Sequence, residues 1–312
     1  MQRYSASGTV PIVGGLMTVV GSLLTAAVMA VVYALIIHWI PFIYLNFLAT
    51  MGFAIAMGVA VTTLASIGKI RSPLFIRGIW LLTLLFGYYV YWGAAIWTHG
   101  GWQLGLIVFD PRAILGFGQV LFEEGSWGLR NGDNITGWFL VAFWVVEFGI
   151  LAYFSYIAAV ANIDQPFCEL CNEWTETEKG VALYQATGKE PEWDRVRLGE
   201  FQALMQVPLL SASLSEYIRM DMNACPKCQN SNFLCIQQVK TTVDKDGDES
   251  TKESPLIANM TLTADQLAQV RTLVEQAADA AAEAAAARAL EMEEAQRAQG
   301  IDPDEMPKIK LD

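Results

Sequence analysis

The sequence has very little histidine: only His38 and His99 among 312 residues, and none in the second half. It also lacks a phosphate-binding Walker loop and a glycine-rich dinucleotide fingerprint. Without histidine, the second half cannot form the histidine-assisted nucleophile on which many hydrolases depend. We therefore expect a protein that is not an enzyme.

Charge is scarce up to Ala161 and abundant after it. Of the 20 basic and 32 acidic residues, six and five lie at or before Ala161, which leaves 14 basic and 27 acidic residues beyond it, a net charge of −13. Such an acidic surface repels the phosphates of nucleic acids and anionic lipids. We expect no nucleic-acid partner for this part of the chain, and its charge suits a basic partner protein.

Long hydrophobic runs fill the part that has little charge. Roughly 20 apolar residues cross a bilayer as a helix. Four runs qualify: residues 16–37, 42–65, 74–96 and 138–161. They predict a mainly α membrane protein with a four-helix transmembrane bundle over residues 1–162. Ala54 and Gly58 in the second run have the spacing of small residues that lets helices approach closely.

The orientation follows from basic residues near the ends of the spans, which stay in the cytoplasm. Arg3 precedes the first run, while Lys69 and Arg71 separate the second from the third. The first run is too long for a cleaved signal peptide, and a second follows at once. We expect a multi-pass protein of the cell (inner) membrane with both termini in the cytoplasm.

The loop over residues 98–136 contains one further apolar stretch. Asp110 and Pro111 interrupt it, and a charge at the bilayer centre costs about 2.5–3.5 kcal/mol. Aspartate followed by proline is typical of a helix start. We predict an interfacial helix over residues 111–122 on the outer face; a fifth span or a re-entrant loop is the alternative.

One carboxyl group, that of Glu147, lies deep in the fourth span, nine residues from Trp138. Tyr88 lies nine residues from Trp97 on the third span, and therefore at a similar depth. An ionisable residue within a membrane indicates a functional site by default. We predict a structural hydrogen bond between Glu147 and Tyr88, with ion or proton translocation as the alternative.

The five cysteines carry the strongest motif. Cys168 and Cys171 form one C-x-x-C knuckle, Cys225 and Cys228 form a second, and Cys235 is left over. Two knuckles supply the four tetrahedral sulfur ligands of a structural zinc site. We predict one structural Zn²⁺ per chain, and thiol–disulfide chemistry is the rival interpretation.

The paired knuckles resemble those of zinc-ribbon and treble-clef modules, over the knuckles and the short stretch around each. The gap between the two pairs is longer than in a compact ribbon, which predicts an inserted helical segment over residues 181–209. Alternating patterns predict strands at 217–222, 233–243 and 256–262. Together these features indicate a small cytoplasmic α+β, zinc-ribbon-like domain over residues 163–262.

A long helix is predicted over residues 263–300. Thr263 and Gln266 form a capping box, the interior is rich in alanine, and Gly300 follows the last turn. The exposed part is either a solvated spacer or one strand of an alanine-seamed coiled coil that would join copies of the chain. Residues 301–312 are expected to be disordered.

These features favour a membrane-anchored, zinc-stabilised scaffold or interaction protein that belongs to a membrane-associated assembly. Its partners would be the lipid bilayer and other proteins, bound through the acidic domain and the long helix. The alternative is a subunit of an ion- or proton-coupled transporter or channel that uses Glu147.

Overall fold

The computed structural model describes residues 2–40, 43–100, 107–125, 134–186, 190–210, 212–228, 230–245 and 248–298. The chain forms two compact units, Ala6–Gln165 and a unit that joins Met1–Ser5 to Pro166–Asp312. The predicted helix stop at Gly300 and the tail over 301–312 lie outside the described residues.

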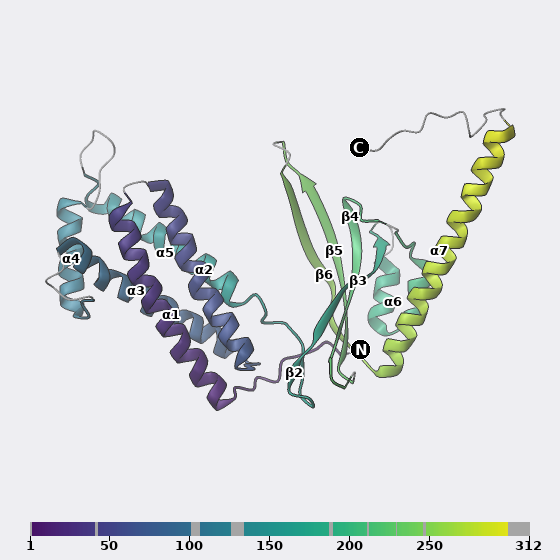
Figure 1. The fold of residues 1–312 in the computed structure, drawn as a ribbon, viewed down its shortest axis with the longest axis horizontal. Helices are drawn as coiled ribbons and strands as arrows, with labels where there is room; N and C mark the ends of the chain where they lie inside the picture. The colour runs from purple at the N-terminus through teal and green to yellow at the C-terminus, as the bar shows by residue number, and fades with distance from the viewer. Residues whose placement is uncertain are drawn as a thin grey trace. The chain divides into compact units, whose positions relative to one another are not determined.

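The first unit is helical (Figure 1). Its helices are α1 (Ile12–Trp39), α2 (Ile43–Ile67), α3 (Pro73–Gly100), α4 (Pro111–Glu124) and α5 (Gly137–Ala159). Proline opens α3 and α4, where its missing N–H costs nothing. The described residues of α1, α2, α3 and α5 are long and apolar enough to cross a membrane.

One apolar cluster forms where the starts of α1 and α3 pack beside the ends of α2 and α5. Its buried members are Val61, Ala65, Ile70, Ile76, Ile79 and Ala159. Val10, just before α1, and Ile163, just after α5, both pack against it. The chain therefore enters and leaves the bundle at the same end, as four crossings require.

Helix α4 is shorter and follows the predicted start. The Asp110 carboxylate accepts a hydrogen bond from the Arg112 N–H at 2.9 Å, which caps the first turn. Phe122 packs edge-on against Trp138 at the start of α5. Leu115 is 74% exposed, so α4 presents apolar surface outward. An interfacial position for this helix stays a prediction.

Glycine sets the distance between α2 and α5. A Cβ on Gly58 would lie 2.3 Å from the Ser155 carbonyl oxygen and 2.6 Å from the Ala158 Cβ. Gly58 belongs to the small-residue pair predicted for close packing, and its neighbour Ala54 is fully buried. The backbone contact between these helices therefore depends on the absence of a side chain at position 58.

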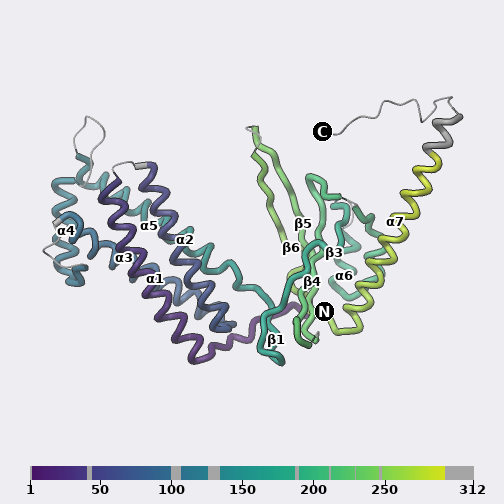
Figure 2. Tube along the Cα trace, viewed as in Figure 1, coloured from purple at the N-terminus to yellow at the C-terminus, as the bar shows by residue number. Residues whose placement is uncertain are grey.

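The second unit contains two antiparallel sheets. A short hairpin joins β1 (Phe167–Cys168) to β2 (Glu173–Trp174). A four-stranded sheet has the order β3-β4-β5-β6, where β3 is Glu176–Gln185, β4 is Glu216–Ala224, β5 is Asn232–Val243 and β6 is Glu249–Leu262. Strands β5 and β6 run beside each other as a long hairpin (Figure 2). The three predicted strands lie within β4, β5 and β6.

The helical elements of this unit cover one face of the larger sheet (Figure 1). They are α6 (Glu190–Leu198), the 3-10 helix η2 (Phe201–Gln206) and the start of α7 (Ala264–Ala298). The buried core between sheet and helices includes Tyr184, Trp193, Phe201, Leu204, Ile218, Met220, Leu234, Ile236, Val270 and Leu273.

The predicted helical insertion over residues 181–209 is wrong at its start. Residues 181–185 belong to β3, because Ala182 and Tyr184 point alternately into the core while the strand pairs with β4. Helical structure begins only at Glu190. Local sequence does not reveal that pairing, because β4 lies more than 30 residues further along the chain.

The first residues of the chain extend the edge of the sheet at β6. The Tyr4 N–H donates to the Asn259 carbonyl at 2.8 Å, and the Thr261 N–H donates to the Gln2 carbonyl at 3.0 Å. The Tyr4 ring packs edge-on against Phe233 of β5, with the ring centroids 5.2 Å apart. These contacts explain why Met1–Ser5 belongs to the second unit.

Helix α7 has a docked start and an exposed continuation. Its capping box forms as predicted: Gln266 N–H donates to Thr263 Oγ1 at 3.2 Å, and Thr263 N–H donates to Gln266 Oε1 at 2.9 Å. Val270, Leu273 and Val274 are buried, whereas residues 278–291 are exposed. The helix therefore projects beyond the sheet it is docked on (Figure 1).

Substitution of Gly58 by alanine should loosen the bundle. The new methyl group meets the backbone of α5, which cannot rotate away, so Gly58→Ala should lower the free energy of unfolding by about 1–3 kcal/mol. Gly52→Ala in the same helix is the control, because a Cβ there meets nothing within 4 Å. Unfolding titrations in detergent measure both. Equal stabilities for the two variants would contradict the tight contact.

Candidate functional site

The structure brings the four knuckle cysteines together. Cys168 ends β1 and Cys171 lies in the turn to β2, while Cys225 and Cys228 lie in the turn between β4 and β5. Their four sulfur atoms all lie within 4.8 Å of one another. Two turns more than 50 residues apart in sequence thus form one cluster that could hold a metal ion.

The sulfur spacing fits a tetrahedral ion and not a disulfide. Cys168 Sγ and Cys228 Sγ are 3.6 Å apart. A tetrahedral zinc with Zn–S bonds of about 2.3 Å places its sulfur ligands roughly 3.8 Å apart, whereas a disulfide holds them at about 2.05 Å. All five cysteines are free thiols. The four donors thus fit Zn²⁺, and they would fill each position of a tetrahedral ion.

A cation accompanies the cluster. Lys227, in the second knuckle, forms an ion pair with Glu173, which lies opposite Cys168 in the β1–β2 hairpin. The hydrogen bond and charge of Glu173 raise the pKa of Lys227, so the ammonium stays protonated beside Cys171 and Cys225. Because four thiolates around a divalent ion carry a net charge of −2, this ammonium offsets part of that charge.

The thiols themselves are unequal. Burial acts to raise the pKa of Cys168, but hydrogen bonds from Ser231 and the neighbouring cysteines outweigh it and lower the pKa to about 6. In contrast, the pKa of Cys171 is raised to about 12, mainly by its hydrogen bond with Cys228. Cys168 therefore forms a thiolate readily, whereas a bound metal must displace the proton of Cys171. Acid should consequently favour release of the metal.

The fifth cysteine lies outside the cluster. Cys235 is buried in β5, where its thiol donates to Asn259 Oδ1 at 2.8 Å and accepts from Asn223 Nδ2 at 3.4 Å. Burial raises its pKa, which keeps it a neutral thiol. Its thiol links Asn223 of β4 to Asn259 of β6, beside the shift in register between β5 and β6. Cys235 belongs to neither knuckle, and it is accordingly absent from the cluster.

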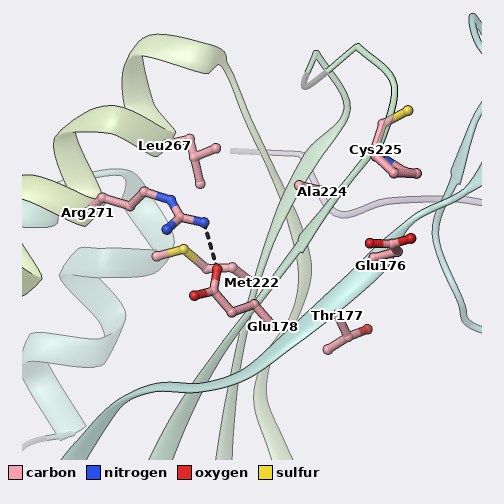
Figure 3. A pocket seen from close by; sticks show the side chains of 9 residues that line it. Glu176, Thr177, Glu178, Met222, Ala224, Cys225, Leu267 and Arg271 are labelled. Atoms are coloured by element: carbon pink, nitrogen blue, oxygen red, sulfur yellow. Dashed lines mark hydrogen bonds and ion pairs between the residues drawn. The ribbon is translucent and has the colours of Figure 1, made fainter.

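A groove of about 510 Å³ adjoins the second knuckle (Figure 3). Glu176, Thr177 and Glu178 of β3 form one wall, and Leu267 and Arg271 of α7 form another. Arg271 and Glu178 are joined by an ion pair of 2.7 Å. The remaining lining residues are Met222, Ala224, Cys225 and Pro226. The groove combines an apolar floor with the unpaired charge of Glu176 among these lining side chains.

A second polar site lies among the apolar helices around Glu147. Its carboxyl oxygen is 2.7 Å from the hydroxyl of Tyr33 on α1, which is in turn 2.7 Å from Thr50 Oγ1 on α2. Thr50 donates to the carbonyl of Asn46 at 2.9 Å. One hydrogen-bonded chain therefore links α5, α1 and α2.

Tyr33 is the centre of this chain. Its hydroxyl donates to Glu147 Oε1, while either hydroxyl can be the donor in the contact between Tyr33 and Thr50. The carboxyl group of Glu147 is therefore tied to two other helices through one tyrosine hydroxyl.

The hydrogen bond predicted from Tyr88 is made instead by Tyr33. Tyr88 lies in the same region, packed edge-on against Phe148 with the ring centroids 5.1 Å apart. Tyr33 stacks on Phe53 and contacts Tyr91. Depth along each span admits several tyrosines, and the sequence alone does not say which helix lies beside α5.

Comparisons with protein-family models, curated proteins and solved structures found no match.

Loss of one knuckle cysteine should release the metal. Cys171→Ser removes a thiolate, and zinc content should fall from about one ion per chain towards zero. Cys235→Ser should keep its zinc, since that thiol lies outside the cluster. Elemental analysis of purified protein measures both, and proteolysis reports on the sheet domain. A metal-free wild type with a protease-resistant domain would contradict the metal centre, and an iron-loaded protein would contradict zinc.

Tyr33→Phe should destabilise the bundle more than Tyr88→Phe. It deletes the hydroxyl that contacts both Glu147 and Thr50, and hydrogen bonds between membrane helices contribute about 0.6–1.7 kcal/mol. Tyr88→Phe leaves this chain intact and serves as the control. Unfolding titrations in detergent give the difference; a larger loss from Tyr88→Phe would restore the original pairing.

Proposed function

We propose that this protein is a non-enzymatic scaffold that fixes a zinc-stabilised interaction domain to the cytoplasmic face of the cell (inner) membrane. The cluster of four cysteines is the observation that carries the proposal. Zn²⁺ would be held by Cys168, Cys171, Cys225 and Cys228. It would link the β1–β2 hairpin to the β4–β5 turn and so hold the acidic sheet domain in one conformation.

The ligand set supports a structural and not a catalytic role. A catalytic zinc keeps one position open for water, whereas four thiolates occupy every tetrahedral position. Cys168 and Cys225 are buried, which limits access to the ion. The metal would therefore stabilise the domain without binding a substrate, as the scaffold function requires.

Basic residues support the cytoplasmic orientation. Lys69 and Arg71 lie in the connection between α2 and α3, at the end of the bundle where the chain both enters and leaves. The Arg71 N–H donates to the Thr9 carbonyl at 2.9 Å, which holds this connection beside the residues that precede α1. By the positive-inside rule this end faces the cytoplasm.

The groove beside the second knuckle is the proposed docking surface, and a basic segment of another protein is the proposed occupant. Glu176 would receive a lysine or arginine side chain, while Met222 and Leu267 would cover its methylene groups. The net charge of −13 beyond Ala161 would attract such a partner over a longer range. The exposed part of α7 offers a further surface for assembly, with a second copy of the chain or with another protein.

A transporter or channel subunit that uses Glu147 is the second candidate. Its support is that Glu147 is only half-buried and continues into a chain of hydroxyl groups. The hydrogen bonds that tie Glu147 to α1 and α2 favour the structural role. Ion flux that depends on Glu147 would decide for the transporter.

Site-specific crosslinking in membranes tests the scaffold. A photoreactive residue in place of Thr177 should capture a protein with a basic segment, and Glu176→Lys should abolish that product. Glu249→Lys makes the same charge change at the far end of the sheet and should leave it intact. Failure to capture any protein, together with loss of ion flux in Glu147→Gln, would overturn the scaffold in favour of the transporter.

A further inference from the structure

The two histidines of the chain meet at one end of the bundle. His38 lies in the last turn of α1 and His99 in the last turn of α3. Their ring centroids are 5.6 Å apart, with the ring planes at 71°. Neither histidine takes part in the cysteine cluster or in the hydrogen-bonded chain at Glu147.

The two histidines lie at the same level of neighbouring helices. A Cβ on Gly87 of α3 would lie 3.4 Å from the Ala26 Cβ of α1, so the two helices pack closely. Position 87 follows position 26 by 61 residues, and position 99 follows position 38 by the same number. Both histidines therefore lie the same distance beyond this contact, one in the last turn of each helix.

One ring nitrogen of His99 is occupied by the backbone. His99 Nδ1 lies 2.9 Å from the Ala95 carbonyl oxygen, and because that oxygen can only accept, Nδ1 carries the proton. Nε2 is then left with its lone pair free, the arrangement in which metal-binding histidines are usually held. Both side chains are exposed, so a metal ion could keep water on its remaining positions.

We propose that His38 and His99 form a second metal site, separate from the cysteines, for a divalent transition-metal ion of the Zn²⁺, Ni²⁺ or Cu²⁺ class. Two imidazoles that bind one ion at about 2.0–2.1 Å place their ring centroids roughly 5 Å apart, close to the distance seen here. Imidazole nitrogen suits these ions, whereas Mg²⁺ and Ca²⁺ require oxygen ligands. The negative ends of α1 and α3 point at the same place and favour a cation there.

The consequence for the bundle is a bridge between α1 and α3 at the end away from Val10 and Ile163. This proposal does not depend on the scaffold function. A bound ion would hold together two helix ends that the contact between the two imidazole rings already brings side by side.

Calorimetric titration with Ni²⁺ tests the site in the full chain, purified in detergent without a histidine tag and with its cysteines loaded with zinc. The wild type should bind one Ni²⁺ per chain and gain thermal stability. His38→Gln and His99→Gln should each weaken binding at least tenfold, and the double variant, which has no histidine at all, should show none. An unchanged helix signal in circular dichroism and an unchanged unfolding midpoint without Ni²⁺ confirm that the bundle of each variant is folded. Absence of saturable Ni²⁺ binding in the wild type, or equal binding by the double variant, would overturn the proposal.

Discussion

The place of the β1–β2 hairpin on the sheet domain depends on one constraint, the meeting of two distant turns at four sulfur atoms. The β1–β2 hairpin pairs only two residues on each side, which is too little to stay folded alone. The β4–β5 turn, by contrast, belongs to a sheet with an extensive core. A metal bound to the cysteines would fix the hairpin to the β4–β5 turn and so stabilise its folded conformation. The ion pair of Lys227 with Glu173 joins the same two turns.

The helical unit needs a different principle, because no hydrophobic force would drive its apolar helices together within lipid. Its specificity comes from shape at Gly58 and from a few polar contacts. The hydroxyl of Tyr33 contacts side chains from two other helices, and the indole N–H of Trp80 on α3 donates to Ser155 of α5 at 2.9 Å. These contacts determine which helices are neighbours, whereas the exposed apolar side chains are compatible with many arrangements of the same helices.

Sequence patterns predicted what is local and missed what depends on pairing between distant segments. The long apolar helices, the pairing of the cysteines and the Thr263 capping box are signalled by neighbouring residues, and the structure agrees with each. Strand β3 begins with three charged residues and a threonine at 176–179, and its buried positions alternate only at Ala182 and Tyr184, where it pairs with β4. The choice of Tyr33 over Tyr88 likewise required knowledge of helix neighbours.

The short strand made by Gln2 to Tyr4 has a consequence for the order of folding. These residues precede the long apolar helices in the sequence, whereas their partners at Asn259 and Thr261 follow them. This edge of the sheet can therefore close only after β6 has been made, across a sequence separation of about 255 residues, and such distant pairings form slowly. Until then Gln2 to Tyr4 remain an unpaired strand, and a segment that competed for the same edge of β6 would delay its closure.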